Sequence, residues 1–166
     1  RLQGNADIPL NDTGIAQAHE AKEKLAGQPI ATICTSPLQR ARKTADIVNK
    51  VLQCPIIEMP GLRECNFGPN EGSTNYGWLR EWLNGDGSTI PPGVEPYDEF
   101  LTRVRTAINE AITAHPGPIL IVAHGGVYVP IKMVLSDNKQ TLLGNGEPVR
   151  HDPPQSSGDV WQTTFL

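Results

Sequence analysis

The chain has 166 residues, of which 38% are hydrophobic and 19% are charged. A chain of this size buries about 70% of its unfolded surface, so intrinsic disorder is excluded for most of it. The 14 basic and 18 acidic residues give a net charge of −4, which offers no broad basic face for nucleic acid or an anionic membrane. No apolar run approaches the roughly 18 residues that cross a bilayer.

The three cysteines, Cys34, Cys54 and Cys65, form neither a disulfide framework nor a paired metal-binding motif. Such thiols are typical of a reducing compartment, so we expect a cytoplasmic protein. The spacing of the four histidines does not indicate a metal site either. We therefore expect neither a metal nor another cofactor.

Helical and strand-like patterns alternate along the chain, with turn residues between them. Asp12 or Thr13 is expected to cap the first helix, and Ser36 with Pro37 to begin the second. Pro55 indicates an edge strand. In chain order, we expect helices over residues 12–27, 36–52, 97–115 and 127–135, and strands over residues 30–35, 54–58, 119–123 and 160–166.

This alternation predicts an α/β layered domain with a mainly parallel central sheet. We expect one domain over residues 1–166. Between residues 59 and 96 the chain is irregular and rich in Gly, Pro and Asn, with one short helix. Loops of this length are usually lids, binding loops or disordered segments, and we interpret residues 73–95 as a lid or insertion.

Polar residues follow two of the expected strands at the point where a helix begins. Ser36 and Arg40 belong to the first junction, and His124 with two glycines forms the second. Ligands of open α/β sheets bind at the carboxyl ends of the strands, and helix N-termini attract anions. Each junction is therefore a candidate anion site.

Arg40 lies in the first turn of its helix, where the helix dipole disfavours a cation unless an anion offsets it. The alternative is a solvated surface arginine beside Arg42 and Lys43. His124 follows a fully apolar strand, and its alternative is a hydrogen-bonded core histidine. A carboxyl group that is partly shielded from water has a raised pKa and can act as a general acid, which makes Glu64 a candidate. Its alternative is a surface glutamate paired with Arg63.

Taken together, these segments resemble the histidine phosphatase superfamily, which has the phosphoglycerate mutase-like fold. The similarity follows the chain in order from residue 1 to about residue 130. The segments that carry it are Arg-Leu-Gln-Gly at 1–4, Asp-Ile-Pro-Leu with the helix start at 7–18, Ser-Pro-Leu-Gln-Arg-Ala at 36–41, Leu-Arg-Glu at 62–64, Phe-Gly at 67–68, Glu-Gly at 71–72, Pro-Gly-Val-Glu at 92–95 and Val-Ala-His-Gly-Gly at 122–126.

The resemblance implies a three-layer α/β/α sandwich and phosphoryl transfer through a phosphohistidine. By position, Arg40 resembles the arginine that clamps the phosphate, and His124 the second histidine, which stabilises charge on the transferring group. Glu64 resembles the acid that protonates the leaving oxygen and then activates water. Three further positions are implied in substrate binding: Gln3, Gly4 and the N–H of Gly125.

The family's nucleophilic histidine lies in an Arg-His-Gly motif that ends the first strand, shortly before the position of Arg1. Neither the motif nor that strand is among these 166 residues. We expect both to be encoded upstream of Arg1, because a sheet without its central strand leaves backbone groups unpaired. The alternative is a genuine fragment, which would retain phosphate binding without turnover.

The implied activity is that of a metal-independent phosphomonoesterase acting on a small phosphorylated metabolite. Alternatives are a phosphoglycerate-type mutase, an inactive module that binds phosphate esters, and a cysteine-dependent phosphatase using the spacing between Cys34 and Arg40. Mutases of the family tend to carry longer lids, which favours hydrolysis here. In the segment 73–95, Asn75, Trp78 and Trp82 are candidates for contacting the substrate. The alternative for the two tryptophans is that they only pack the short helix, and we favour this alternative for Trp82. The identity of the ester and the choice between monomer and homodimer stay open.

Overall fold

The structure is a computed structural model of the chain, and it describes all residues except 76, 84–87, 89, 136–142 and 157–158. Its centre is a parallel sheet of three strands in the order β2–β1–β3. These strands are β1 (Thr32–Thr35), β2 (Ile56–Glu58) and β3 (Ile119–Val122). The prediction of a parallel α/β sheet is confirmed, and so is the edge position of the strand that follows Pro55.

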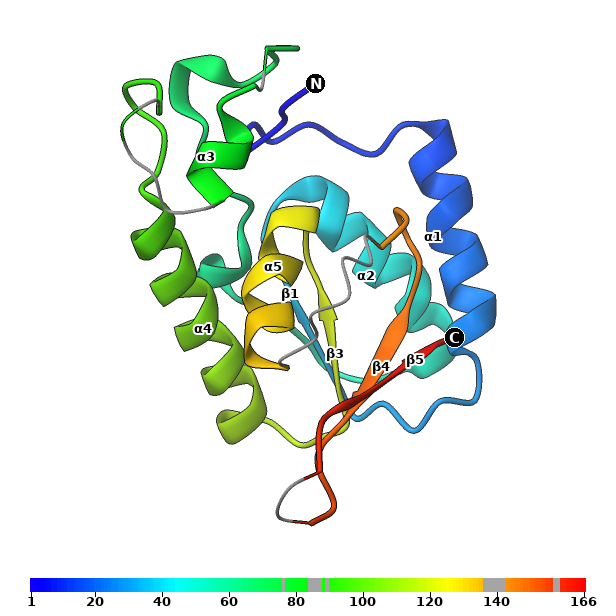
Figure 1. The fold of residues 1–166 in the computed structure, drawn as a ribbon. Coiled ribbons are helices and arrows are strands. Elements are labelled where there is room, and N and C mark those ends of the chain that lie inside the picture. The colour runs from blue at the N-terminus through cyan, green and yellow to red at the C-terminus, as the bar shows by residue number, and fades with distance from the viewer. Residues whose placement is uncertain (76, 84–87, 89, 136–142, 157–158) are drawn as a thin grey trace.

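Helices cover both faces of this sheet (Figure 1). Consecutive strand residues point to opposite faces, and β1 shows this directly. Ile33 packs into the core formed with α1 (Asp12–Leu25) and α2 (Gln39–Leu52), whereas Cys34 packs into the core formed with α4 (Tyr97–Ala114) and α5 (Gly125–Val134). The predicted three-layer α/β/α arrangement is therefore confirmed.

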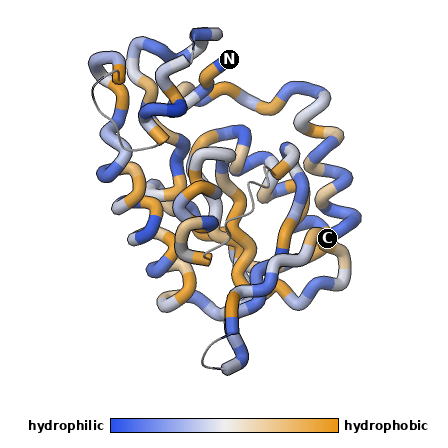
Figure 2. The backbone as a smooth tube through the Cα atoms, in the orientation of Figure 1, coloured by the Kyte–Doolittle hydropathy of each residue, from blue (hydrophilic) through white to orange (hydrophobic). Residues whose placement is uncertain are grey.

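Burial differs between the strands in a way that follows the strand order. All four residues of β1, the middle strand, are buried, whereas all four residues of β3 are only half-buried. β3 is an edge strand that pairs only with β1 among the described strands. It is therefore less buried than its fully apolar sequence had predicted. Figure 2 shows the hydrophobic colouring gathered on these central strands and on the inward sides of the helices.

Two helices begin at other residues than the sequence predicted. Asn11, rather than Asp12 or Thr13, caps α1, because its side chain accepts a hydrogen bond from the N–H of Gly14 at 2.8 Å. The helix expected from Ser36 begins at Gln39. Its first N–H is capped by a carboxylate from a distant loop, which is described below with the site.

The remaining elements lie at the periphery. Two short 3-10 helices, η1 (Pro60–Leu62) and η2 (Gly68–Asn70), and the short helix α3 (Leu79–Leu83) occupy the irregular segment. Near the C-terminus, β4 (Val149–Asp152) and β5 (Gln162–Phe165) form an antiparallel pair. The strand predicted over residues 160–166 is thus confirmed in β5, while β4 was not predicted. Over the part of the chain that the structure describes, no helix is both long and apolar enough to cross a membrane.

The segment interpreted as a lid, residues 73–95, includes positions 76, 84–87 and 89, which lie outside the described residues. The chain just before this segment lies close to the end of the segment. A Cβ atom on Gly68, which has a φ of 54°, would collide with the backbone carbonyl of Gly93. Trp82 between them is only 1% exposed, which confirms that this tryptophan packs the short helix.

Candidate active site

The two strand-to-helix junctions meet at the carboxyl edge of the sheet. The N–H of Ser36, just after β1, donates to the carbonyl of Val122 at the end of β3, at 3.0 Å. The side chain of the same Ser36 also contacts His124, two residues after Val122: the Nε2 atom of His124 and the Oγ atom of Ser36 lie 2.8 Å apart and are hydrogen-bonded. The parallel register of β1 and β3 places these residues side by side, since both strands end at the same edge.

Arg40 points from the first turn of α2 into the protein rather than into solvent. It is 9% exposed, and its guanidinium donates to the carbonyl of Gly4 at 2.6 Å and to that of Ala6 at 2.8 Å. The N-terminal segment that carries these carbonyls crosses above the carboxyl ends of the strands (Figure 1). The alternative of a solvated surface arginine is therefore wrong for Arg40. It describes Arg42, which pairs with Asp46 and Glu58 at the surface.

The N-terminus of α2 already has an anionic partner from the protein itself. The Oδ1 atom of Asp7 accepts from the N–H of Gln39 at 2.7 Å, and its Oδ2 atom accepts from the side chain of Gln39 at 3.0 Å. These two hydrogen bonds lower the pKa of Asp7. The anion expected at the first junction is thus supplied by Asp7, while the charge of Arg40 remains directed at the neighbouring loop.

Glu64 approaches the second junction from the irregular segment. Its Oε2 atom accepts from the N–H of Gly126 in the first turn of α5 at 3.1 Å, and its Oε1 atom accepts from the N–H of Cys65 at 2.9 Å. Burial raises the pKa of this carboxyl group, while the two N–H donors and the charges of Arg40 and Arg103 oppose that rise. Glu64 is therefore not a surface glutamate paired with Arg63, and its burial favours the protonated form that a general acid needs.

His124 is the N-cap of α5 and is half-buried. Burial, followed by repulsion from the charges of Arg40 and Arg103, lowers its pKa to about 3. The ring is consequently neutral at pH 7 in the protein without a bound anion. A phosphate group beside it would add negative charge and favour the protonated ring.

The three positions implied in substrate binding differ in their surroundings. Gln3 is exposed, and its backbone carbonyl accepts from the N–H of Ala6 at 3.1 Å. Gly4 is buried under the guanidinium of Arg40. Gly125 is exposed at the start of α5, where an added Cβ atom would meet nothing within 4 Å. Open space therefore lies beside Gly125, next to His124.

Cys34, the nucleophile of the cysteine-dependent alternative, lies inside β1 and is 0% exposed. Burial and the negative charge of Glu110 raise its pKa, so the thiolate is disfavoured. Its side chain packs in the core on the α4 side of the sheet. This environment is that of a structural cysteine rather than of an attacking group.

The arrangement combines a buried cation, a neutral imidazole, a carboxyl group of raised pKa and the N-terminus of a ten-residue helix. A tetrahedral dianion suits such a site, because the cation and the helix N-terminus favour negative charge. Among the described residues, no three His, Cys, Asp or Glu side chains gather in a way that could hold a metal ion.

Several residues of the site were missed by the sequence analysis. The second glycine of the His-Gly-Gly motif, Gly126, contacts Glu64, although the sequence favoured Gly125. Ser36 was expected to cap a helix; its Oγ atom accepts from the N–H of Leu38 at 3.3 Å, and the unpredicted contact is its hydrogen bond with His124. Asp7, Glu95 and Arg103 have partners about 30 or more residues away along the chain, so no local signal identifies those contacts.

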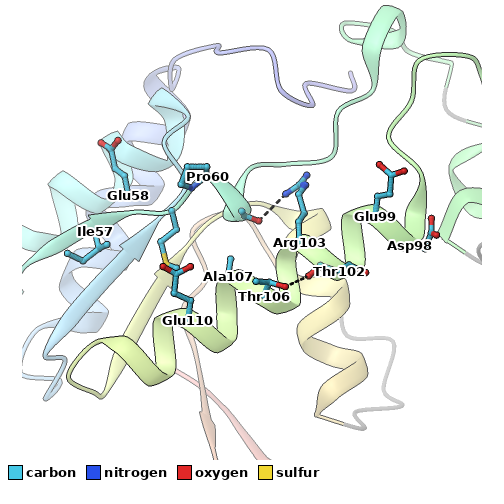
Figure 3. Close-up of a pocket in the computed structure, with 12 residues that line it drawn as sticks. Ile57, Glu58, Pro60, Asp98, Glu99, Thr102, Arg103, Thr106, Ala107 and Glu110 are labelled. Carbon is cyan, nitrogen blue, oxygen red and sulfur yellow. Dashed lines mark hydrogen bonds between the residues drawn. The ribbon is translucent and has the colours of Figure 1, made fainter.

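A groove of about 660 Å³ lies beside the site, between the end of β2 with η1 and the outer side of α4 (Figure 3). Four acidic side chains line it, and Arg103 lies at its edge with its guanidinium turned toward η1. The acidic residues are Glu58, Asp98, Glu99 and Glu110. Arg103 thus borders both this groove and the backbone next to Glu64.

The chain is similar to several known proteins. At 38% identity, the chain matches an uncharacterized phosphatase, PhoE, of Bacillus subtilis (strain 168) over 75% of its own length and 63% of the relative. At 37% identity it matches a probable phosphoglycerate mutase, GpmB, of Photorhabdus laumondii over 75% of its own length and 62% of the relative. The chain therefore spans less than two thirds of each of these curated relatives.

Among solved structures, a mycobacterial glucosyl-3-phosphoglycerate phosphatase superposes with a TM-score of 0.69 at 26% identity, over 82% of this chain and 72% of the other. The sequence profile of the histidine phosphatase superfamily (branch 1) matches residues 1–153. Fold, motif order and profile agree, and the chain belongs to the histidine phosphatase superfamily.

Proposed function

We propose that the protein is a phosphomonoesterase that passes the phosphoryl group of a small phosphorylated metabolite first to a histidine and then to water, without a metal ion. The observation that carries this proposal is the meeting of Glu64 and His124 at the start of α5, with Arg40 acting electrostatically on both. The named phosphatases among the relatives also support it.

The proposed roles follow from the charges. Phosphoryl transfer depends mostly on positioning and on stabilising the charge of the equatorial oxygens. Arg40 and His124 would bind those oxygens, together with the N–H of Gly125. Gln3 and Gly4 belong to the loop that Arg40 fixes, on the side from which the phosphate would be covered.

In the first step, a bond forms between a histidine nitrogen and phosphorus while the bond from phosphorus to the ester oxygen breaks. Glu64 gives its proton to the departing oxygen. In the second step, a water oxygen bonds to phosphorus, the nitrogen–phosphorus bond breaks, and the Glu64 carboxylate takes the proton of that water. We assign the attacking nitrogen to the histidine of the family's Arg-His-Gly motif, which is not among these 166 residues.

A mutase is the second candidate, because relatives named probable phosphoglycerate mutase match the chain. Both activities share the first step and differ only in the acceptor of the phosphoryl group. In a mutase the phosphohistidine transfers to a second hydroxyl group of the same substrate. A lid of only residues 73–95 and the phosphatase relatives support hydrolysis, and we further propose a cytoplasmic location for the enzyme.

The test uses the protein expressed from its complete gene. It is incubated with a ³²P-labelled phosphate ester and quenched, and we expect a protein adduct that is labile in acid and stable in base. The Cys34→Ser variant should form the same adduct. Binding of the ester without any adduct would support the inactive binding module instead. With 3-phosphoglycerate, release of inorganic phosphate supports the hydrolase, and the 2-phospho isomer supports the mutase.

A further inference from the structure

Arg103 on α4 holds the backbone of the segment that carries Glu64. Its Nη1 atom donates to the carbonyls of Gly61 at 3.0 Å and Arg63 at 2.8 Å, and its Nη2 atom donates to the carbonyl of Glu64 at 2.9 Å. Figure 3 shows the first of these bonds, with the guanidinium turned toward η1. Because a guanidinium is a rigid plane of five N–H donors, one arginine fixes all three carbonyls together.

The same guanidinium is fixed in turn by Glu95. The Nε and Nη2 atoms of Arg103 donate to the two carboxylate oxygens of Glu95 at 2.5 Å and 2.8 Å, which makes the salt bridge bidentate. The side chains are 26% exposed for Arg103 and 14% exposed for Glu95. The pair is therefore largely shielded from solvent, where such contacts are stronger than at the surface.

Glu95 is itself held at both of its ends. Its Oε2 atom accepts from the N–H of Asn66 at 3.0 Å, and its own N–H donates to the carbonyl of Asn66 at 2.8 Å. Its carbonyl accepts from the indole N–H of Trp82 at 2.8 Å. The ring of Phe100 lies 4.8 Å below the guanidinium of Arg103. The charged pair is thus embedded between α3, α4 and the loop of Asn66.

Glu64 is consequently anchored from two helices at opposite ends of the residue. Arg103 of α4 holds its carbonyl, and the N–H of Gly126 in α5 holds its carboxyl group. The charge of Arg103 also acts on the acid: it lowers the pKa of Glu64, against the effect of burial. A rotation of the backbone at Glu64 would withdraw the carboxyl group from α5.

We propose that Glu95 and Arg103 are the positioning pair of Glu64, which keeps its carboxyl group aimed at the start of α5, where it protonates the departing oxygen. This inference rests on the proposed function. It goes further by assigning a role in proton transfer to two residues that touch neither the phosphate nor the reacting atoms. An arginine that merely stabilises the fold would affect all substrates alike.

The first experiment compares two phosphate esters in the full-length protein. Arg103→Ala should lower kcat/KM for an alkyl phosphate by about 10²-fold, the size expected from a misplaced catalytic group. It should lower kcat/KM for 4-nitrophenyl phosphate by much less, because that leaving group departs with little need of a proton. Glu95→Gln keeps the shape of the side chain and removes its charge. It should also lower kcat/KM for both esters, and more for the alkyl phosphate. Arg105→Ala, an exposed arginine on the same helix, is the matched control.

A double variant separates positioning from folding. In the Glu64→Gln background, Arg103→Ala should cause almost no further loss, since the acid that it positions is already gone. An additional loss as large as in the wild-type background would overturn the proposal, as would an equal loss for both esters. The Arg103→Lys variant keeps the charge and covers the case in which Arg103→Ala does not fold.

A titration gives a result that does not depend on turnover. The ¹³C signal of the Glu64 carboxyl group, identified by its absence in Glu64→Gln, should show a higher pKa in Arg103→Ala and a smaller rise in Arg103→Lys. An unchanged pKa in both variants contradicts the proposal. If the wild-type protein forms no phosphoenzyme at all, the proposed function fails, and the titration still decides whether the pair controls Glu64.

Discussion

The N–H of Gly126 donates to the Oε2 atom of Glu64 at 3.1 Å, and the carboxyl group leaves no room for a side chain at residue 126. An added Cβ atom at Gly126 would collide with the carboxyl group of Glu64, the far end of a flexible side chain. Residue 126 must therefore be glycine so that the carboxyl group of Glu64 can approach α5. The conformation of the helix itself does not require glycine there.

Gly126→Ala should displace the carboxyl group of Glu64 and lower kcat/KM for alkyl phosphates by up to about 10²-fold. The thermal midpoint should change little, because the side chain that moves is flexible. Gly125→Ala separates the steric effect from the loss of a glycine, since its added Cβ meets nothing within 4 Å. That variant should keep the wild-type pKa of Glu64. Gly126→Ala should change this pKa, because it moves the carboxyl group. If the pKa of Glu64 changes equally in Gly126→Ala and Gly125→Ala, the collision with the added Cβ atom is not the cause of the change.

Arg40→Ala should lower kcat/KM by about 10²–10³-fold, the usual effect of removing one donor to a charged transition state. It should also cost about 1–3 kcal/mol of stability, because the carbonyls of Gly4 and Ala6 lose their donor. Binding of inorganic phosphate, measured by calorimetry, should weaken in parallel. Arg42→Ala, two residues further along α2, should change neither quantity by much, as its ion pairs are exposed. A near-normal rate in Arg40→Ala would remove this arginine from the site.

Glu64→Gln should suppress turnover most for esters with poor leaving groups, with losses of about 10²–10⁴-fold, the range of general acid catalysis. The measurement is kcat/KM for a series of aryl and alkyl phosphates, plotted against the pKa of the leaving alcohol. The slope should become steeper in the variant. Parallel lines for variant and wild type would assign Glu64 another role.

His124 should make the protein without bound anion less stable as the pH falls. Its pKa is about 3 in the folded protein and about 6.5 when unfolded, so the unfolded chain binds the extra proton between these values. The stabilisation is fully present above pH 6.5 and is lost toward pH 3, with a limiting slope of about 1.4 kcal/mol per pH unit.

Urea unfolding at several pH values measures this slope, and His124→Gln should flatten it. Glu64 has the opposite effect on the pH dependence of stability. Because its pKa is raised in the folded state, the folded protein binds this proton before the unfolded chain does as the pH falls. The difference between variant and wild type isolates His124 from that effect. A His124→Gln curve parallel to that of the wild type would contradict the buried, neutral ring.

The sequence predicted the parts of the structure that depend on local pattern. Strand-helix alternation indicated the layers, and Pro55 indicated the edge position of β2. Ser36 and His124 could be placed at the same edge of the sheet, because parallel strands end on the same side. Glu64 was a candidate from its residue type, and the resemblance to the family gave it a role, but no local pattern placed it beside α5.

Contacts between distant segments could not be predicted in the same way. The start of α2 at Gln39 depends on Asp7, which lies 32 residues earlier, and the pKa of Glu64 depends on Gly126 and Arg103. In α1, three successive residues are acceptable caps, and the structure uses Asn11. β4 has no alternating pattern and is defined only by its pairing with β5.

The approach of Gly68 to Gly93 has a consequence for how this scaffold can change over evolution. Both glycines stand at the base of one excursion of the chain, so residues can be added within it without moving its two ends apart. Because closing a loop of doubled length costs only about 0.6 kcal/mol more, insertions there are cheap. Descendants of this sequence can therefore vary the length of that excursion while the two glycines at its base stay in contact.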